Sequence, residues 1–262
     1  MTRSVALTLA LAFSLAVSAS AQQNPNPIPK DPSEWPQHSL TRPTPSVVLP
    51  GAMASTGAPS DAVVLFDGTS LDAWRTADTT LLKPARWSIG NGALEVAPGT
   101  GGIMTRRRFG DVQLHVEWMT PTPAVGEGQE RGNSGIFLMS RYEVQVLDSW
   151  QNPTYADGQA GSIYGQFPPR VNAVRPPGEW QNYDIIFHRP HFDTDGKLTV
   201  PARLTVFLNG VLIQEDQMLL GPTSNAVRTP YRAHADQLPI LLQDHGVKVR
   251  FRNIWLRELG DG

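Results

Sequence analysis

The arrangement of short apolar segments around two-residue turn signals constrains the fold more than any other feature of this sequence. Asn91-Gly92 and Asn209-Gly210 each stand between two segments rich in apolar residues, a pattern typical of tight β-hairpins. Across residues 112–118 apolar and polar side chains alternate strictly, as expected of a strand with one buried face. No segment of ten or more residues has the periodicity of an amphipathic helix. The sequence therefore predicts an all-β domain in which two antiparallel sheets pack as a sandwich.

Further segments with the same character complete the expected sheets. They are residues 63–66, 87–89, 93–96, 136–139, 142–147, 183–187, 204–208, 211–213 and 247–259. The last of them changes phase near Asn253, which indicates a β-bulge. A domain of about 200 residues can bury a stable core without cross-links, which fits the absence of cysteine. That absence excludes disulfides, thiolate zinc sites and a cysteine nucleophile.

The first 21 residues have the three parts of a secretory signal peptide. Arg3 supplies positive charge, residues 5–17 are almost entirely apolar, and Ala19-Ser20-Ala21 has the small residues of a cleavage site. The apolar run is shorter than the ~20 residues needed to span a bilayer. No cysteine follows that could carry a lipid anchor. We therefore expect cleavage after Ala21, export to the periplasm or the medium, and no transmembrane anchor.

Residues 22–60 form a proline-rich arm, with nine prolines and no apolar periodicity. Proline denies the hydrogen bonds that helices and sheets need, so this segment cannot build a core of its own. The sequence favours a disordered tail or linker. The alternative is that Trp35 and residues 47–49 dock on the surface of the domain. The folded domain is expected to extend over residues 61–262.

Charge and missing motifs exclude several classes of protein. The formal net charge is −2, and no stripe of lysine and arginine is threaded with aromatic residues, so we expect no nucleic-acid partner. Neither the Gly-x-Ser-x-Gly nucleophile elbow nor the His-Glu-x-x-His zinc motif occurs. His191, Asp193 and Asp195 alternate as at the start of a calcium loop, but Leu204 stands where such a loop needs glutamate. We expect a long hairpin connection there instead.

The strand expected over residues 142–148 is the most informative for chemistry. Alternation places Tyr142, Val144 and Val146 on one face and Glu143 with Gln145 on the other. The latter two lie about 6.6 Å apart, from two strand steps of ~3.3 Å. On the concave face of a curved sheet, Glu143 would be an acid or base and Gln145 a partner for sugar hydroxyls. The alternative is an ordinary solvated strand face.

Three other regions carry candidate site residues. In the turn Gln243-Asp244-His245-Gly246, Asp244 can orient His245 for acid–base chemistry. The alternative is that Asp244 caps the turn and His245 is merely exposed. Asn133 lies in a glycine-flanked turn before a strand, where it would contact a ligand or serve the turn alone. A glycine-rich segment, residues 157–166, carries three more candidates for substrate binding, since long loops on β scaffolds often bear function: Asp157, Gln159 and Tyr164.

Eight segments in order along the chain carry a family resemblance. They are residues 65–74 (LFDGTSLDAW), 132–138 (GNSGIFL), 142–148 (YEVQVLD), 155–161 (YADGQAG), 163–165 (IYG), 176–180 (PPGEW), 243–246 (QDHG) and 251–255 (FRNIW). In these segments the chain resembles the 3-keto-disaccharide hydrolase family, also called 3-keto-glycoside hydrolases or lyases. The resemblance runs from about Val64 to Leu259. It implies a concanavalin-A-like jelly roll and activity on sugars oxidised at C3.

The chemistry that the resemblance implies is an elimination. A ketone at C3 acidifies the proton on C2, so that a base can remove it and form an enolate. The enolate expels the glycosidic oxygen from C1, and water later adds back to give a free 3-keto sugar. This needs a base, a donor to the enolate oxygen and an acid for the leaving group.

The candidate residues are assigned to these roles as follows. Glu143 and His245 are base and acid in either order, and Asp244 or Asp148 orients the histidine. The hydroxyls or the ketone are bound by three amides: Asn133, Gln145 and Gln243. A divalent metal would polarise the ketone. Its candidate ligands are Asp148, Asp157, Glu143 and His245, although no spacing identifies a metal site.

Two alternatives use the same fold. A non-catalytic carbohydrate-binding module would need exposed aromatic residues, for which Trp150, Tyr155 and Trp180 are the candidates. An ordinary glucanase would need a second carboxylate beside Glu143. Related sandwich glucanases carry carboxylates at every second position of one strand, whereas Gln145 and Leu147 stand there in this chain. The anomer, the aglycone, the metal and the oligomeric state are left open by the sequence.

Overall fold

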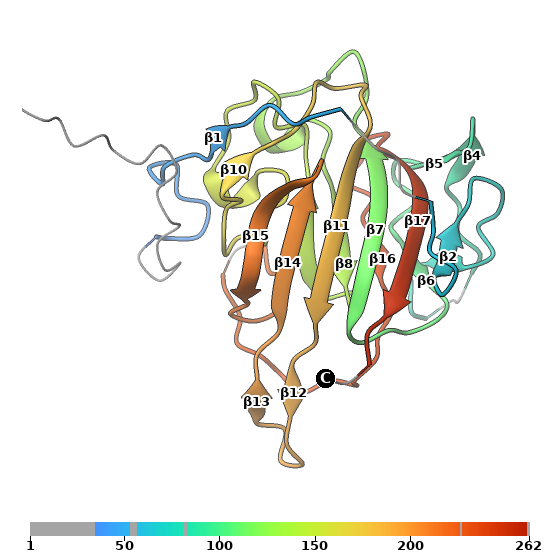
Figure 1. Ribbon diagram of the computed structural model, residues 1–262, viewed down its shortest axis with the longest axis vertical. Helices are drawn as coiled ribbons and strands as arrows, with labels where there is room; N and C mark the ends of the chain where they lie inside the picture. Colours follow the sequence, from blue (N-terminus) through green and yellow to red (C-terminus); the bar gives the residue numbers. More distant parts are fainter. Residues whose placement is uncertain (1–34, 53–56, 81–82, 226, 261–262) are drawn as a thin grey trace, which may run out of the picture.

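The structure, a computed structural model, describes residues 35–52, 57–80, 83–225 and 227–260. The expected signal peptide, residues 1–21, and residues 22–34 of the arm lie outside this part of the chain. Two β-sheets pack face to face (Figure 1), and helical structure in the described part is confined to the short 3₁₀ turns η2 (Gly128–Glu130) and η3 (Ala156–Gly158). No helix there has the length and hydropathy to cross a membrane.

The larger sheet has eight strands in the order β15-β14-β11-β7-β17-β5-β4, with β2 alongside β17. Neighbouring strands are antiparallel throughout. The strands are β2 (Val63–Phe66), β4 (Ser88–Gly90), β5 (Ala93–Glu95), β7 (Val112–Met119), β11 (Gln181–His188), β14 (Arg203–Leu208), β15 (Val211–Met218) and β17 (Arg250–Glu258).

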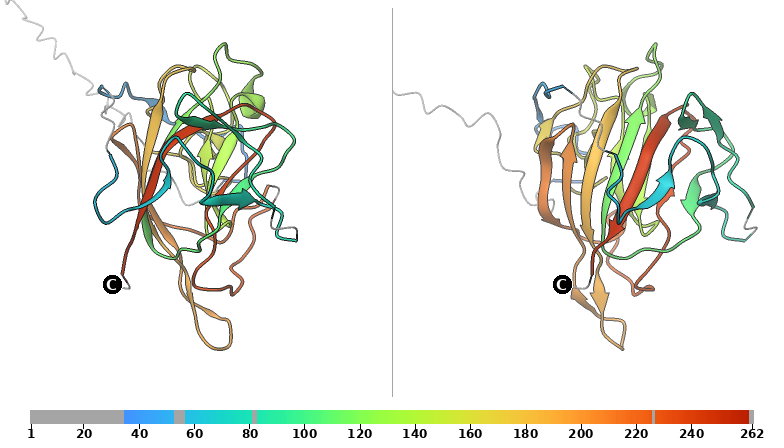
Figure 2. Two further views of the ribbon diagram at one scale, coloured as in Figure 1. Left: turned by 90° about the vertical axis from the view of Figure 1, so that its right-hand side faces the viewer. Right: turned by 45° about the vertical axis from the view of Figure 1, so that its right-hand side comes forward.

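The smaller sheet has five strands in the order β3-β6-β16-β8-β9. Its strands are β3 (Trp74–Thr76), β6 (Ile103–Thr105), β16 (Leu241–Leu242), β8 (Ser134–Leu138) and β9 (Tyr142–Val146). The left view of Figure 2 shows the two sheets from the side as separate layers. The predicted fold, a two-sheet antiparallel sandwich of the concanavalin-A-like jelly-roll type, is confirmed.

The turn signals in the sequence have the expected geometry. Asn91 and Gly92 have φ of 53° and 69°, and Asn209 and Gly210 have φ of 53° and 79°, as a type I′ hairpin turn requires. In β17 the register shifts between Arg252 and Trp255, and the intervening Asn253 has φ of 46°, which confirms the bulge. The segment that begins like a calcium loop is the hairpin of β12 (His191–Phe192) and β13 (Leu198–Val200).

The core lies between the two sheets and holds the alternating apolar residues of both. The apolar face of β7 is at most 1% exposed, and so are Tyr142, Val144 and Val146 of β9. Burial of each such side chain contributes about 1.5–3 kcal/mol to folding. Tyr183 of β11 crosses this core and donates its hydroxyl hydrogen to the Gln145 backbone oxygen at 2.8 Å. This hydrogen bond fixes the distance between β9 and the larger sheet. The opposite face of β9 bears the candidate site.

The proline-rich arm is where the structure departs most from the expectation. Residues 35–52 lie against the domain, so the disordered tail that the sequence favoured is wrong for them. Of the apolar patch expected to dock, Val48 packs against the core, whereas Val47 and Leu49 are 67% and 75% exposed. β1 (Ser46–Val47) pairs in parallel with β10 (Val171–Asn172), and Arg42, only 4% exposed, donates to the Gln166 backbone oxygen at 3.1 Å. Prolines prevent the arm from forming sheet by itself, but the polar groups between them bond to loops of the domain.

Candidate functional site

Glu143 and His245, which are 102 positions apart in the sequence, line the same cavity. This cavity, here called the polar cavity, has a volume of about 250 Å³. Strands β9, β8 and β16 are neighbours, so the turn that follows β16 passes over β8 toward Glu143. The polar cavity is lined by Asn133, Glu143, Gln145, Tyr164, Asn225, Gln243 and His245. The predicted convergence of the 142–148 strand and the 243–246 turn is therefore present.

Two short contacts hold the 243–246 turn to β8. The Gln243 backbone N–H donates to Gly135 O at 3.0 Å, and Ser134 Oγ donates to Gln243 O at 2.7 Å. Gly135 also makes room for the acid, because a Cβ at this position would overlap Glu143 Oε1. The glycine therefore lets the Glu143 side chain lie across its neighbouring strand and reach the polar cavity.

Glu143 is a buried carboxyl group, and the residues that line the polar cavity include no lysine or arginine. The residue is 4% exposed, and burial raises the pKa of its carboxyl to about 8. Its backbone N–H donates to Thr223 Oγ1 at 3.0 Å, which ties β9 to the loop covering the sheet edge. At neutral pH the unliganded site therefore holds Glu143 mainly in its protonated form.

Gln145 extends from the same face of β9 and contacts the acid. One end of its amide lies 3.1 Å from Glu143 Oε1 and 3.0 Å from Ser134 O, and the other end lies 3.1 Å from Gln129 Oε1. An amide donates through nitrogen to an ionised carboxylate and accepts through oxygen from a protonated one. Because Ser134 O can only accept, the end of the amide near Glu143 is its nitrogen, which donates to Ser134 O and to Glu143 Oε1. Gln145 is therefore a positioning residue as well as a lining residue.

The structure corrects the role predicted for Asp244. Its two carboxylate oxygens accept hydrogen bonds from the backbone N–H groups of Gly101 and Gly246, both at 2.9 Å. Asp244 therefore caps the turn, and within the described residues it forms no hydrogen bond to His245. The imidazole is exposed at the mouth of the polar cavity.

Asp148 does not orient the histidine either. Its side chain is 2% exposed and accepts from Arg131 Nε at 2.7 Å and from the Trp150 backbone N–H at 3.1 Å. A buried carboxylate satisfied in this way stabilises the loop around it. Both predicted orienting roles are wrong for the same reason. The carboxylates of Asp244 and Asp148 already accept hydrogen bonds from backbone N–H groups or from Arg131.

The glycine-rich segment contributes one of its three candidates to the polar cavity. Tyr164 lines it, and its hydroxyl lies 2.8 Å from that of Tyr155. Asp157 is fully buried behind this pair, where Oδ2 accepts the His38 backbone N–H at 3.1 Å. Gln159 is buried and does not belong to the lining. The substrate contacts predicted for Asp157 and Gln159 are therefore wrong, because both residues are buried and neither lines the polar cavity.

Sequence reasoning missed His38 in the proline-rich arm. Its ring stacks on Tyr155 with centroids 4.2 Å apart, and it lies 5.0 Å from the ring of Tyr164. Gln37, the residue before it, donates to Ser224 O at 2.6 Å. The arm thus forms the outer support of the Tyr155–Tyr164 pair. No local pattern could have revealed this, because the contact with Asp157 joins residues 119 positions apart.

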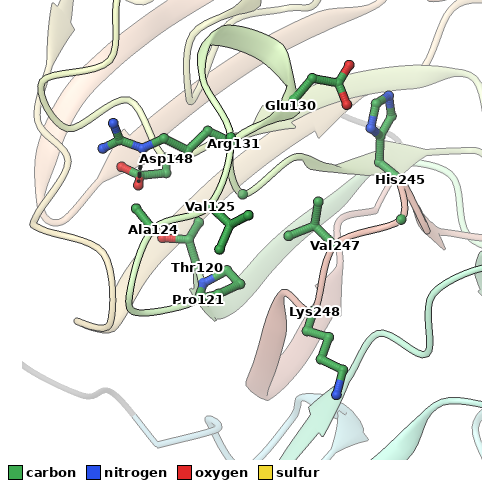
Figure 3. A pocket seen from close by; sticks show the side chains of 13 residues that line it. Thr120, Pro121, Ala124, Val125, Glu130, Arg131, Asp148, His245, Val247 and Lys248 are labelled. Carbon is green, nitrogen blue, oxygen red and sulfur yellow. Dashed lines mark hydrogen bonds and ion pairs between the residues drawn. The ribbon is translucent and has the colours of Figure 1, made fainter.

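A second hollow, here called the apolar cavity, adjoins the polar cavity and shares His245 with it. Its volume is about 570 Å³. Residues 120–126 after β7 and residues 245–248 before β17 supply much of its wall. In Figure 3 the carboxylate of Glu130 and the ring of His245 point toward one another at its upper edge, while Val125 and Val247 face each other below.

The family model of the 3-keto-alpha-glucoside-1,2-lyase-like domain matches residues 61–257. The chain belongs to this family. A crystal structure from Parabacteroides distasonis ATCC 8503, whose name assigns it to the glycosyl hydrolases, is 46% identical. It aligns over 83% of this chain and 93% of its own, with a TM-score of 0.75. Together these findings support a carbohydrate-active, hydrolase-like role.

Two further crystal structures from the same organism, named in the same way, share the fold. They are 19% and 22% identical, align over 76% of this chain and over 94% and 99% of theirs, and have TM-scores of 0.54 and 0.53. No curated protein sequence matches the chain.

The four residues proposed as metal ligands do not fit a metal ion. Only Glu143 and His245 line the polar cavity, while Asp148 binds Arg131 and Asp157 faces the arm. Within the described part of the chain, no three His, Asp or Glu side chains are grouped so that they could hold a metal ion. The four residues therefore do not form a metal site.

Proposed function

We propose that this protein is an exported enzyme that cleaves the glycosidic bond of 3-keto sugars by elimination across C1 and C2, followed by hydration. The observation that carries the proposal is the presence of one buried carboxyl and one imidazole in the lining of the same polar cavity. Within the described residues that line it, Glu143 is the only carboxylic acid. Ordinary glycosidases need two carboxyls, roughly 5 Å apart for retention or 6.5–9.5 Å for inversion.

The roles follow from the protonation states. His245 is the base that takes the C2 proton, because its imidazole lines the polar cavity together with Glu143 and can accept a proton. Glu143, whose pKa is about 8, holds the proton that the leaving C1 oxygen needs. The C1–O bond breaks as the C1–C2 double bond forms, and water then adds across it.

The amides of the polar cavity bind the ketone and hydroxyls. Asn133 Nδ2 donates one hydrogen to Gln129 O at 2.7 Å, which leaves its second N–H for the oxygen of the enolate. Gln243 Oε1 is buried with no hydrogen-bond partner among the described residues, so it offers an acceptor for a sugar hydroxyl. The Asn133 N–H is thus the donor that stabilises the charge developing on the C3 oxygen, while Gln243 orients a hydroxyl of the sugar.

A lectin-like role is less well supported by the geometry. The three aromatic candidates do not share one open surface: Tyr155 is stacked under His38, and Trp180 lies under the Arg252 guanidinium at 4.0 Å. Trp150 is half-buried against the core. A stacking platform needs exposed rings that lie in one plane, and two of these three rings already have partners.

The test compares oxidised and plain sugars. The protein is incubated with 3-keto-trehalose, a 3-keto-glucoside and the unoxidised forms, and release of the aglycone is followed. We expect turnover of the keto forms alone, and Glu143→Gln and His245→Ala should each lower kcat/KM by about 10²–10⁴-fold. Glu215→Gln and His191→Ala, outside both cavities, are the matched controls. Cleavage of the plain sugars alone, or full activity in both site variants, would contradict the proposal.

Export is part of the proposal and has its own test. Residues 1–21 have the pattern of a signal peptide that is removed. Expression of the full chain in a bacterial host should yield periplasmic or secreted protein whose first residue is Gln22. Recovery of protein that still begins at Met1 in the cytoplasm would contradict export.

A further inference from the structure

The apolar cavity beside the site has the position of a leaving-group subsite. It meets the polar cavity at His245, and the neighbouring residues Gly132 and Asn133 line one cavity each. A sugar held by the amides of the polar cavity, with C2 beside His245 and its C1 oxygen within reach of Glu143, directs the group attached to that oxygen past His245 into the apolar cavity. Whatever is attached to that oxygen must occupy this space.

Much of the wall of the apolar cavity is hydrocarbon, and the exposed carboxylate of Glu130 lies at its edge beside His245. Pro121, Ala124 and Val125 line one side, and Val247 lines the other. Val125 is 72% exposed, so a ligand that covers its side chain removes apolar surface from water, which favours binding. The volume of about 570 Å³ is far more than a methyl group fills and lies in the range of pockets for ring-bearing small molecules.

The polar groups at the floor of the apolar cavity are already engaged. Arg131 and Asp148 form an ion pair of 2.7 Å, and Arg131 also donates to the Trp150 backbone oxygen. They therefore have little capacity left to bond a second sugar ring, which carries several hydroxyl groups. At the rim, Lys248 is 67% exposed and its Nζ lies 3.8 Å from Glu95 Oε1, so its charge stays in water.

We propose that the apolar cavity binds the aglycone, and that the preferred substrates are 3-keto-glycosides of apolar, ring-bearing alcohols rather than 3-keto-disaccharides. This inference rests on the proposed function, since it takes the polar cavity as the place of the keto sugar. Selectivity arises because an apolar ring displaces water from valine, alanine and proline. A sugar ring loses several hydrogen bonds to water there and can replace few of them, chiefly with the Glu130 carboxylate at the edge.

The experiment compares leaving groups of similar acidity. The 3-keto forms of benzyl glucoside and methyl glucoside, each as both anomers, are assayed beside 3-keto-trehalose. Benzyl and methyl alcohol are comparable leaving groups, so a difference in kcat/KM reports on the aglycone pocket. We expect kcat/KM for the benzyl substrate to exceed that for the other two by about tenfold or more.

A matched pair of variants assigns the preference to the cavity. Val125→Asp places a charge on the apolar wall, and Val200→Asp places the same charge on the distant β12–β13 hairpin, where Val200 is 46% exposed. We expect the ratio of benzyl to methyl kcat/KM to fall about tenfold in Val125→Asp and to keep its wild-type value in Val200→Asp.

The outcomes separate the two proposals. Turnover of methyl and benzyl substrates at equal rates, or a benzyl-to-methyl ratio that Val125→Asp leaves unchanged, overturns the aglycone subsite while the elimination stands. A higher kcat/KM for 3-keto-trehalose than for the benzyl substrate overturns it as well. No turnover of any 3-keto-glycoside contradicts the proposed function, and the subsite falls with it.

Discussion

Glu143 shows how a single residue acquires its chemistry from its surroundings. On a solvated strand face its carboxyl would ionise near pH 4.5, but burial raises its pKa to about 8. Because the acid must hold a proton to protonate the leaving group, kcat/KM for a 3-keto-glycoside should fall as pH rises through about 8. The measurement is kcat/KM from pH 5 to 10. A profile that instead rises through pH 4.5 and stays flat to pH 10 would show that the ionised form is the active one.

Gly135 is the residue that gives Glu143 its room. A methyl group there would overlap Glu143 Oε1, so Gly135→Ala must displace the acid. We expect kcat/KM to drop about 100-fold, since small misplacements of a catalytic group are costly, while the melting temperature changes little. Gly90→Ala is the control, because a Cβ at Gly90 meets no atom within 4 Å. Equal activity of the two variants would count against the placement of Glu143.

At the scale of elements, the proline-rich arm belongs to the site. His38 covers Tyr155, whose hydroxyl lies 2.8 Å from that of Tyr164 in the cavity wall. His38→Ala removes the stacked ring, so Tyr164 should become less well positioned and kcat/KM should fall about tenfold.

Two further variants distinguish loss of the stacked ring from a general disturbance of the arm. His38→Phe keeps a flat ring over Tyr155 and should restore most of the activity. Leu40→Ala alters a neighbouring arm residue that is 83% exposed and should have no effect. Wild-type activity in His38→Ala, or a loss that His38→Phe does not restore, would show that the stacked ring does not support the site.

The bulge in β17 brings two polar side chains to a buried carboxylate of β7. It turns Asn253 toward β7, where its amide donates to Glu117 Oε1 at 2.9 Å, and Arg252 Nε donates to Glu117 Oε2 at 2.6 Å. Glu117 is fully buried and lies 3.8 Å from His115, so the bulge helps to balance a charge cluster on the outer face of the larger sheet.

For the whole molecule, that cluster makes stability depend on pH. Burial alone would lower the pKa of His115, but hydrogen bonds to Asp184, at 2.7 Å, and to Glu117 outweigh it and raise the pKa to about 9. A raised histidine pKa stabilises the fold fully below about pH 6.5, and this contribution disappears as pH rises through about 9.

Urea unfolding at pH 6, 7.5 and 9.5 measures this effect. The free energy of unfolding of the wild type should fall across this range by on the order of 2 kcal/mol more than that of His115→Gln. The raised pKa of Glu143 acts in the same direction up to about pH 8, and the comparison with the variant removes its share. Parallel curves for the two proteins would show that His115 is not charged in the fold.

Strands and turns could be predicted from the sequence because their signals are local. The alternation in β7 and the Asn-Gly pairs depend on neighbouring residues alone, and the sheets follow from them. The approach of Glu143 to His245 could be proposed from the sequence but needed the fold to establish it, since it depends on β16 lying beside β8. The partners of Asp148 and Asp244 could not be predicted, because a carboxylate bonds whichever arginine or N–H group the folded loops bring nearest.

The central claim is that cleavage passes through removal of the proton on C2. The most direct measurement is to run the reaction of a 3-keto-glycoside in D₂O and to read the deuterium content at C2 of the released 3-keto sugar by NMR. A sample of free 3-keto sugar without enzyme corrects for spontaneous exchange. We predict deuterium at C2 of the enzymatic product from the first turnover. Glu143→Gln and His245→Ala should slow formation of this deuterated product as much as they lower kcat/KM. A cleaved product that keeps its original hydrogen at C2 would contradict the elimination.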